Sequence, residues 1–300
     1  MFRKITMLSI FLSFICFQET IASAQNDLKE QLTLELMKKS GLEQQIVHTP
    51  DVLKTAVASN FRRALRTKNN STNEITNKVQ SVISKSFRPE IIKSVISTHM
   101  ETELDITDIK AVLEWLDSPL GKKITILEEE ASTAEAYKAM AATIPILKKK
   151  TDYNKRLQLM RELDNNIKAT DSTLERELNM QIVSLTAMSS AFPTMSLPST
   201  ESLKENFKSY STNMRQQISA TIMMNSLYTY RQLRLDEIES YIGFIKTDYG
   251  ERYHRIVHEG INKAFLYCGK QFGKNVGKIL AKDSAQEFNR PDIQTYPQRK

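Results

Sequence analysis

Two segments of the chain resemble each other at a constant offset of 129 residues. Residues 104–121 open with Leu-Asp-Ile-Thr-Asp-Ile and close with Ser-Pro-Leu-Gly, and residues 233–250 open with Leu-Arg-Leu-Asp-Glu-Ile and close with Thr-Asp-Tyr-Gly. Upstream, Leu-Glu-Leu-Met-Lys at 34–38 resembles Leu-Gln-Leu-Met-Arg at 157–161, at an offset of 123. Repetition of this kind indicates that one structural unit occurs twice in tandem.

The composition favours helices throughout. Glycine and proline are scarce, with 8 of each in 300 residues, and apolar residues recur three and four positions apart over long stretches. No segment shows the alternation that is typical of a half-buried β-strand. We therefore predict an all-α protein. It would be a tandem duplication of a helical bundle unit with tight turns between helices, one unit at residues 25–150 and the other at residues 151–281.

The first helix of each repeated segment is expected to begin at an N-cap. Thr107 and Asp236 occupy equivalent positions just before an apolar run, and the side-chain oxygen of either residue could accept a hydrogen bond from an exposed N–H group of the new helix. Glu239 follows Asp236 by three residues, which predicts a capping box. The apolar run that follows should face the core.

A second helix is expected to follow at once in each segment. Ser118-Pro119 in one copy and Thr247 in the other supply a hydroxyl cap, and proline suits the first helical position. Gly121 and Gly250 fall in the first turn, where glycine weakens a helix by about 1 kcal/mol relative to alanine. Glycine in both copies indicates that two backbones approach closely. We interpret the pattern as a tight helix–turn–helix corner with a structural role.

The N-terminus is typical of a secretory signal peptide over residues 1–24. A basic start is followed by a largely apolar stretch and then by Ala22-Ser23-Ala24, a small-x-small cleavage site. The apolar stretch is shorter than the ~20 residues of a spanning helix. We expect export to the periplasm of a Gram-negative bacterium, with cleavage at about Ala24 and a soluble mature chain. The alternative is an uncleaved membrane anchor. Residues 282–300 are polar and are predicted to form a disordered tail.

Charge and cysteine content narrow the possible roles. The net charge of +7 is not concentrated enough to indicate nucleic-acid binding, and export argues against it further. Cys16 would leave with the signal peptide, so Cys268 would be the single cysteine of the mature chain. Its apolar neighbours favour a small core residue. Intermolecular pairing and a reactive thiol are the alternatives.

The segment from Thr107 to Gly121 resembles exported bacterial proteins of the domain-of-unknown-function family two-zero-five-nine. Thr107-Asp108-Ile109, Trp115 and Ser118-Pro119-Leu120-Gly121 are similar to that family's pattern. The second copy retains Asp236, Phe244, Thr247 and Gly250 but has Asp248 in place of the proline. The resemblance implies an exported, all-helical protein, and it implies no activity or cofactor.

Few residues suggest chemistry. His254 and His258 lie one helical turn apart with Glu251 nearby, a spacing that could place two imidazoles on one metal ion. Arg255 stands where a His-Glu-x-x-His motif has glutamate, so we favour exposed polar helix residues over a metal site. The Glu128-Glu129-Glu130 run is interpreted as a solvated helix face, because adjacent side chains point in different directions.

Two segments could bind a partner. The loop with Phe192, Met195 and Leu197 carries apolar side chains between prolines, and exposed apolar loops can be docking sites. A loop folded over the bundle is the alternative. Lys270, Lys274 and Lys278 form a basic stripe, continued by Lys282, that could touch anionic lipids or polymers. A solvated helix face is the alternative there.

The folding signals are strong and no reactive site is assembled in the sequence. We therefore predict a non-catalytic periplasmic binding protein without cofactors, whose partner is an unknown protein or envelope component. The first alternative is a peripheral protein that binds an anionic membrane surface or polymer through the basic C-terminal helix. The second is a metal-dependent envelope enzyme. Ligand, partner and oligomeric state are not specified by the sequence.

Overall fold

The protein is all-helical over the residues that its computed structural model describes, which are 25–65, 70–191 and 199–288; no strand occurs among them. The predicted fold class is confirmed. After a helix at residues 25–39, the elements are α2 (Leu42–Leu65), α3 (Asn70–Ser86), α4 (Pro89–Glu103), α5 (Ile106–Asp117), α6 (Pro119–Ala131), α7 (Ala134–Leu147), α8 (Tyr153–Ile167), α9 (Ala169–Ala191), α10 (Thr200–Thr229), the 3-10 turn η1 (Tyr230–Gln232), α11 (Leu235–Ile245) and α12 (Asp248–Phe288).

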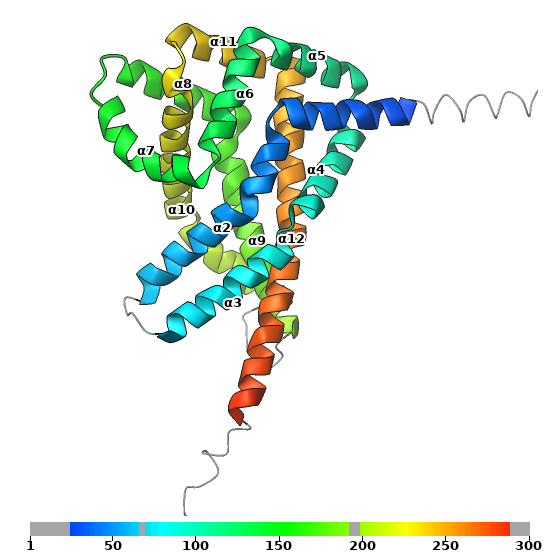
Figure 1. Cartoon of the computed structure of the whole chain (residues 1–300), viewed down its shortest axis with the longest axis vertical. Helices are drawn as coiled ribbons and strands as arrows, with labels where there is room; N and C mark the ends of the chain where they lie inside the picture. Colours follow the sequence, from blue (N-terminus) through cyan, green and yellow to red (C-terminus); the bar gives the residue numbers. More distant parts are fainter. Residues whose placement is uncertain (1–24, 66–69, 192–198, 289–300) are drawn as a thin grey trace, which may run out of the picture.

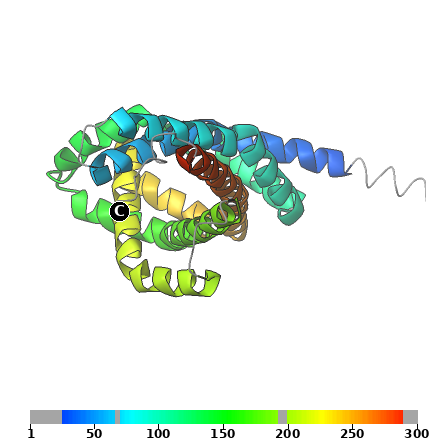
Figure 2. The ribbon, with the colours of Figure 1, turned by 90° about the horizontal axis from the view of Figure 1, so that it is seen from below.

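Helix α12 runs through the length of the molecule and organises the packing (Figure 1). It packs against α9 and also against α3, α4 and α5 from the first half of the chain. Seen from below, the other helices curve around it (Figure 2). The contact with α9 is close: a Cβ at Gly273 would lie 2.0 Å from the carbonyl oxygen of Ser184. Small residues let two helix backbones approach in this way.

The two predicted corners are present. Ser118 Oγ accepts a hydrogen bond from the Gly121 N–H at 3.0 Å, and Thr247 Oγ1 accepts one from the Gly250 N–H at 3.1 Å. A Cβ at Gly121 would lie 2.2 Å from the carbonyl oxygen of Trp115, and the same approach occurs at Gly250. Pro119 occupies the first helical position of α6. Both glycines are thus required by the backbone of the preceding helix.

The predicted caps of the first corner helices are wrong. Helix α5 begins at Ile106, so Thr107 is an exposed residue of its first turn and does not cap it. Helix α11 begins at Leu235, and the Arg234 N–H donates to Glu237 Oε2 at 2.7 Å. Asp236 pairs instead with the Arg234 guanidinium, at 2.7 Å. Each helix starts earlier than expected because apolar Ile106 and Leu235 join the first turn.

The corners pack on each other through equivalent residues. The rings of Trp115 and Phe244 stack with centroids 3.9 Å apart and an interplanar angle of 13°. These aromatic residues lie in the last turn of their helices and are separated by the 129-residue offset. Stacking of equivalent residues is what a local two-fold relationship produces.

Two ion pairs repeat the same relationship. Lys123 Nζ lies 2.8 Å from Glu237 Oε1, and the Arg252 guanidinium forms a two-point contact with Asp108 at 2.6 and 2.8 Å. Lys123 and Arg252 are equivalent at the offset of 129, and so are Asp108 and Glu237. Each corner therefore gives the other a cation and receives one. The reciprocity is local, and duplication of the whole unit stays a prediction.

Two further details of the sequence-based description change. The second helix of the first corner ends at Ala131, because Thr133 Oγ1 accepts from the Ala136 N–H at 3.2 Å and starts α7 as a separate helix. At the other end, α12 continues to Phe288, into the segment expected to be a disordered tail. The signal-peptide prediction and the last part of that tail lie outside the described residues.

One apolar core spans the predicted unit boundary. It joins residues such as Ile96, Ile109 and Ile124 from the first half to Leu163, Ile242 and Ile256 from the second. The boundary at residue 150 falls in the turn between α7 and α8. Cys268 belongs to this core with no exposed surface, and burial raises the pKa of its thiol to about 11. No helix among the described residues combines the length and hydropathy that crossing a bilayer requires.

Candidate functional site

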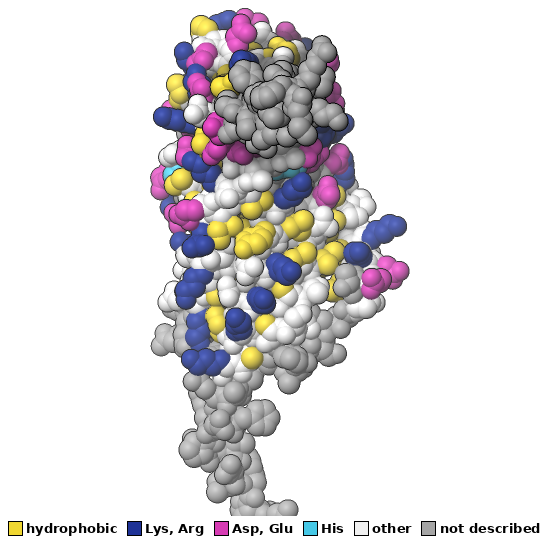
Figure 3. Space-filling model, turned by 90° about the vertical axis from the view of Figure 1, so that its right-hand side faces the viewer, with side chains coloured by type: hydrophobic (Ala, Val, Ile, Leu, Met, Phe, Trp, Pro, Cys, Tyr) yellow, Lys and Arg dark blue, Asp and Glu magenta, His cyan; other side chains and the backbone are white. Residues whose placement is uncertain are grey.

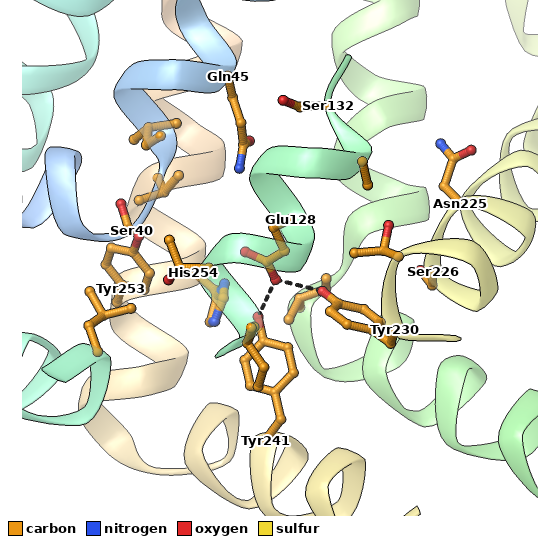
Figure 4. Close-up of a pocket in the computed structure, with 18 of the residues that line it drawn as sticks. Ser40, Gln45, Glu128, Ser132, Asn225, Ser226, Tyr230, Tyr241, Tyr253 and His254 are labelled. Carbon is orange, nitrogen blue, oxygen red and sulfur yellow. Dashed lines mark hydrogen bonds between the residues drawn. The ribbon is translucent and has the colours of Figure 1, made fainter. Parts of the chain in front are cut away.

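A cavity of about 360 Å³ lies against the stacked corners, and Figure 4 shows many of the side chains that line it. Trp115 and Phe244 form part of its wall, and α2, α6, α7, α10 and α12 supply most of the rest. Every lining residue is buried or half-buried. The volume falls in the range of about 300–1,000 Å³ that small-molecule sites occupy.

Glu128 is the only carboxylic acid among the described residues that line the cavity. Tyr230 Oη donates a hydrogen bond to its Oε1 at 2.6 Å, and Tyr241 Oη donates to the same atom at 3.1 Å (Figure 4). Removal from bulk water raises the pKa of Glu128, and the two phenol hydrogen bonds oppose that rise. Burial also raises the pKa of both phenols well above the usual value, and the nearby Glu128 charge adds to this effect.

Helix register explains why Glu128 points into the cavity while Glu130 faces solvent. It follows Ile124 by four residues and precedes Ala131 by three, so it lies on the apolar stripe of α6. Glu130 is exposed. The interpretation of the whole glutamate run as a solvated face is therefore wrong for Glu128. Two residues, about half a helical turn, separate an interior carboxyl from a surface carboxyl.

Arg156 of α8 fixes the turn that carries Tyr230. Its buried guanidinium donates to the carbonyl oxygens of Tyr230 at 3.0 Å and Leu233 at 2.9 Å, and it pairs with Asp152 at 3.0 Å. Carbonyl groups in a turn between two helices lack helical partners, and a forked cation satisfies two of them at once. The Tyr230 phenol is thereby held at a defined distance from Glu128.

The two histidines also face inward, which contradicts the expectation of exposed residues. Burial lowers the pKa of His254 to about 3, with a contribution from His258. Burial, together with the Arg176 charge, lowers the pKa of His258 to about 4, opposed by a hydrogen bond to the Ile167 backbone. Both rings are thus neutral at physiological pH. The inward position of the two histidines follows from the register of α12, because positions 254, 257, 258 and 261 lie on one face of the helix.

Two polar atoms at the cavity lack hydrogen-bond partners. His254 Nε2 and Asn225 Oδ1 are buried and unpaired among the described residues, and both side chains line the cavity. Buried polar groups are nearly always hydrogen-bonded, so unpaired groups beside an open volume indicate a place for water or a ligand. Aromatic rings surround this volume: Tyr241 and Tyr253 lie 6.5 and 5.1 Å from the His254 ring centroid.

The weak metal candidates do not converge. Glu251 is exposed, whereas His254 and His258 face the cavity. Within the described ranges, no three His, Cys, Asp or Glu side chains gather as a metal ion would need. Phe192, Met195 and Leu197 lie outside the described residues. Lys270, Lys274 and Lys278 are exposed on α12, away from the cavity.

Comparisons of the chain with protein-family models, with curated proteins and with solved structures found no match. The resemblance to the domain-of-unknown-function family therefore stays a prediction.

Proposed function

We propose that the protein is a non-catalytic, exported binding protein that takes up a small molecule in the cavity beneath the two corners. The observation that carries this proposal is the combination of an open volume with unpaired polar atoms at Asn225 and His254. A cavity that served packing alone would be apolar and small, because voids and unsatisfied polar groups both cost stability. Mostly apolar walls with a few fixed polar groups are the usual composition of a ligand site.

The protonation states favour binding over catalysis. His254 and His258 have pKa values of about 3 and about 4, so neither ring is a good proton acceptor or a source of protons at neutral pH. Glu128 already accepts two phenol hydrogen bonds through one oxygen. No serine, threonine or cysteine at the cavity is hydrogen-bonded to either histidine, so the pairing that activates a nucleophile is missing among the described residues.

Trp115 gives a direct assay, because it is the single tryptophan of the chain and lines the cavity. A library of soluble fragments would be screened for changes in its emission. We expect hits with the wild-type protein that disappear in Ser226→Phe, which fills the cavity. Ser209→Phe, at an exposed position of the same helix, should retain them. An absence of hits, or hits that persist in Ser226→Phe, would contradict the proposal.

Binding to an anionic membrane surface is a second candidate, favoured by the lower half of α12. Lys270, Lys274 and Lys278 are exposed there, and Tyr267 and Leu280 expose 47% and 36% of their surface. Figure 3 shows Lys and Arg side chains among hydrophobic ones on the lower part of one face, where acidic side chains are sparse. Basic residues beside exposed apolar groups suit adsorption to anionic lipid.

Vesicle sedimentation tests this candidate. The protein should sediment with vesicles of phosphatidylglycerol and not with vesicles of phosphatidylcholine, and replacement of the three lysines by glutamine should abolish sedimentation. Glutamine at Lys54, Lys110 and Lys148 is the control for a loss of net charge alone. Equal sedimentation of both triple variants would count against a site on α12.

A further inference from the structure

We infer that the ligand of the central cavity is a small organic cation, a protonated amine or a quaternary ammonium group, held between Glu128 and the aromatic wall. This inference deepens the proposed function and rests on it. It concerns the charge of the ligand, which the volume of the cavity alone does not specify.

The first step is the charge balance of the lining. Glu128 is the one acidic side chain among the described lining residues, and no lysine or arginine is among them. The two histidines at the cavity are neutral near pH 7, as shown above. A buried carboxylate without a cationic partner is costly, so a ligand that brings a positive charge is favoured. A ligand carboxylate or phosphate would meet a like charge and no counter-ion.

The second step is the aromatic wall. Trp115 stacks on Tyr241 at 5.4 Å and on Phe244 at 3.9 Å, and all three side chains line the cavity. Tyr230 and Tyr253 add two more rings. The faces of such rings attract cations, with tryptophan the strongest, and cages of aromatic residues are a known way to hold quaternary ammonium groups. Among the described residues, no lysine or arginine lies over the face of these rings.

The third step is hydrogen bonding. Both phenols donate to Glu128 Oε1, and neither donates to Oε2. Asn225 Oδ1 is an acceptor without a donor. Acceptors without donors match a ligand that carries N–H groups and accepts little, as a primary ammonium does.

Four probes on closely related skeletons test the charge. They are choline, 3,3-dimethylbutylamine, 3,3-dimethylbutan-1-ol and 3,3-dimethylbutanoate, titrated against Trp115 emission. The alcohol has the shape of choline without the charge, and the acid carries the opposite charge. We expect the two cations to bind at least ten-fold more tightly than the alcohol, and the acid not to bind.

Glu128→Gln keeps the shape of the side chain and removes its charge, and Glu130→Gln removes an exposed charge from the same helix. The first variant should weaken the binding of both cations at least ten-fold and leave the alcohol within two-fold. The second should change neither. Equal cation binding in Glu128→Gln and wild type would overturn the inference.

The outcomes separate the inference from the proposed function. If the alcohol or the acid binds as tightly as the cations, and Ser226→Phe abolishes that binding, the cavity binds ligands but the charge assignment is wrong. If none of the four probes binds in the millimolar range, the inference is also wrong, and the fragment screen decides separately on the proposed function.

Discussion

Trp115 and Phe244 stack at 3.9 Å, although 129 residues separate them in the chain. The contact joins the two corners at equivalent positions, and the same two rings form part of the wall of the central cavity. Architecture and candidate site thus share residues. The repeated motif was interpreted as purely structural, and the structure places a cavity with ionisable groups directly beneath it.

The corner glycines should be intolerant of side chains. A Cβ at Gly121 would lie 2.2 Å from a backbone oxygen of the preceding helix, which cannot move aside as a flexible side chain would. We expect Gly121→Ala to lower the free energy of unfolding by about 3 kcal/mol, measured by urea denaturation. Gly243→Ala is the control, because nothing lies within 4 Å of its Cβ position, and it should stabilise α11 by up to about 1 kcal/mol. Equal effects at both sites would contradict the close approach.

Acid should destabilise the protein through its buried histidines. Their folded pKa values of about 3 and about 4 lie below the ordinary value of 6.5. Between these values the two histidines bind protons in the unfolded chain but stay neutral in the folded protein. Stability is therefore fully present above about pH 7 and falls as the pH drops below it. Each ring should contribute a loss of about 2 kcal/mol between pH 7 and pH 5.

The variant His254→Gln isolates one of these contributions. Its free energy of unfolding should depend less on pH than that of the wild type, by the amount given for one ring. His48→Gln is a control in an exposed part of α2, where the ring borders Gln44 at 3.4 Å. An unchanged pH dependence in His254→Gln would show that this ring is not shielded from protons.

Glu128 should act in the opposite direction. Burial raises its pKa, so the folded state retains a proton that the unfolded chain releases above the ordinary value of 4.5. The contribution of this group to stability is present below that value and is lost as the pH rises. Glutamine cannot ionise. The stability difference between Glu128→Gln and wild type should therefore shift in favour of the variant from pH 4 to pH 7, and a shift in the other direction would refute the buried-carboxyl assignment.

Both reciprocal ion pairs should stabilise the contact between the corners. Double-mutant cycles with Asp108→Asn and Arg252→Gln, and with Glu237→Gln and Lys123→Gln, measure the coupling within each pair. We expect two favourable couplings, because Asp108 and Glu237 expose only 10% and 14% of their side chains. The Lys39–Asp117 pair, whose acid exposes 47% of its side chain, should couple more weakly. If the coupling energy were zero in both cycles, the ion pairs would not contribute to holding the corners together.

Local patterns predicted the helices and the corners well. Ser118 and Gly121, or Thr247 and Gly250, stand three apart, and the cap hydrogen bond between them involves only neighbouring residues. Thr107 and Asp236 were misplaced because several polar residues near a helix start can satisfy the same rule. The exact start depends on whether an apolar residue such as Ile106 is drawn into the first turn by burial.

The candidate site was harder to predict because its parts come from distant segments. Tyr230 and Tyr241 lie 102 and 113 residues from Glu128 along the chain, and no local pattern links them. One signal was present: Glu128 falls in register with Ile124 and Ala131, so the apolar stripe of this helix contains an acid. His254 gave the same signal on the face that carries Val257 and Ile261.

The most direct test is a crystal structure of the protein with the cation that binds most tightly. The account predicts density in the cavity between Glu128 and the ring of Trp115, with the positive group nearer to the carboxylate. Density only elsewhere on the protein, or no ordered ligand at saturating concentration, would contradict it.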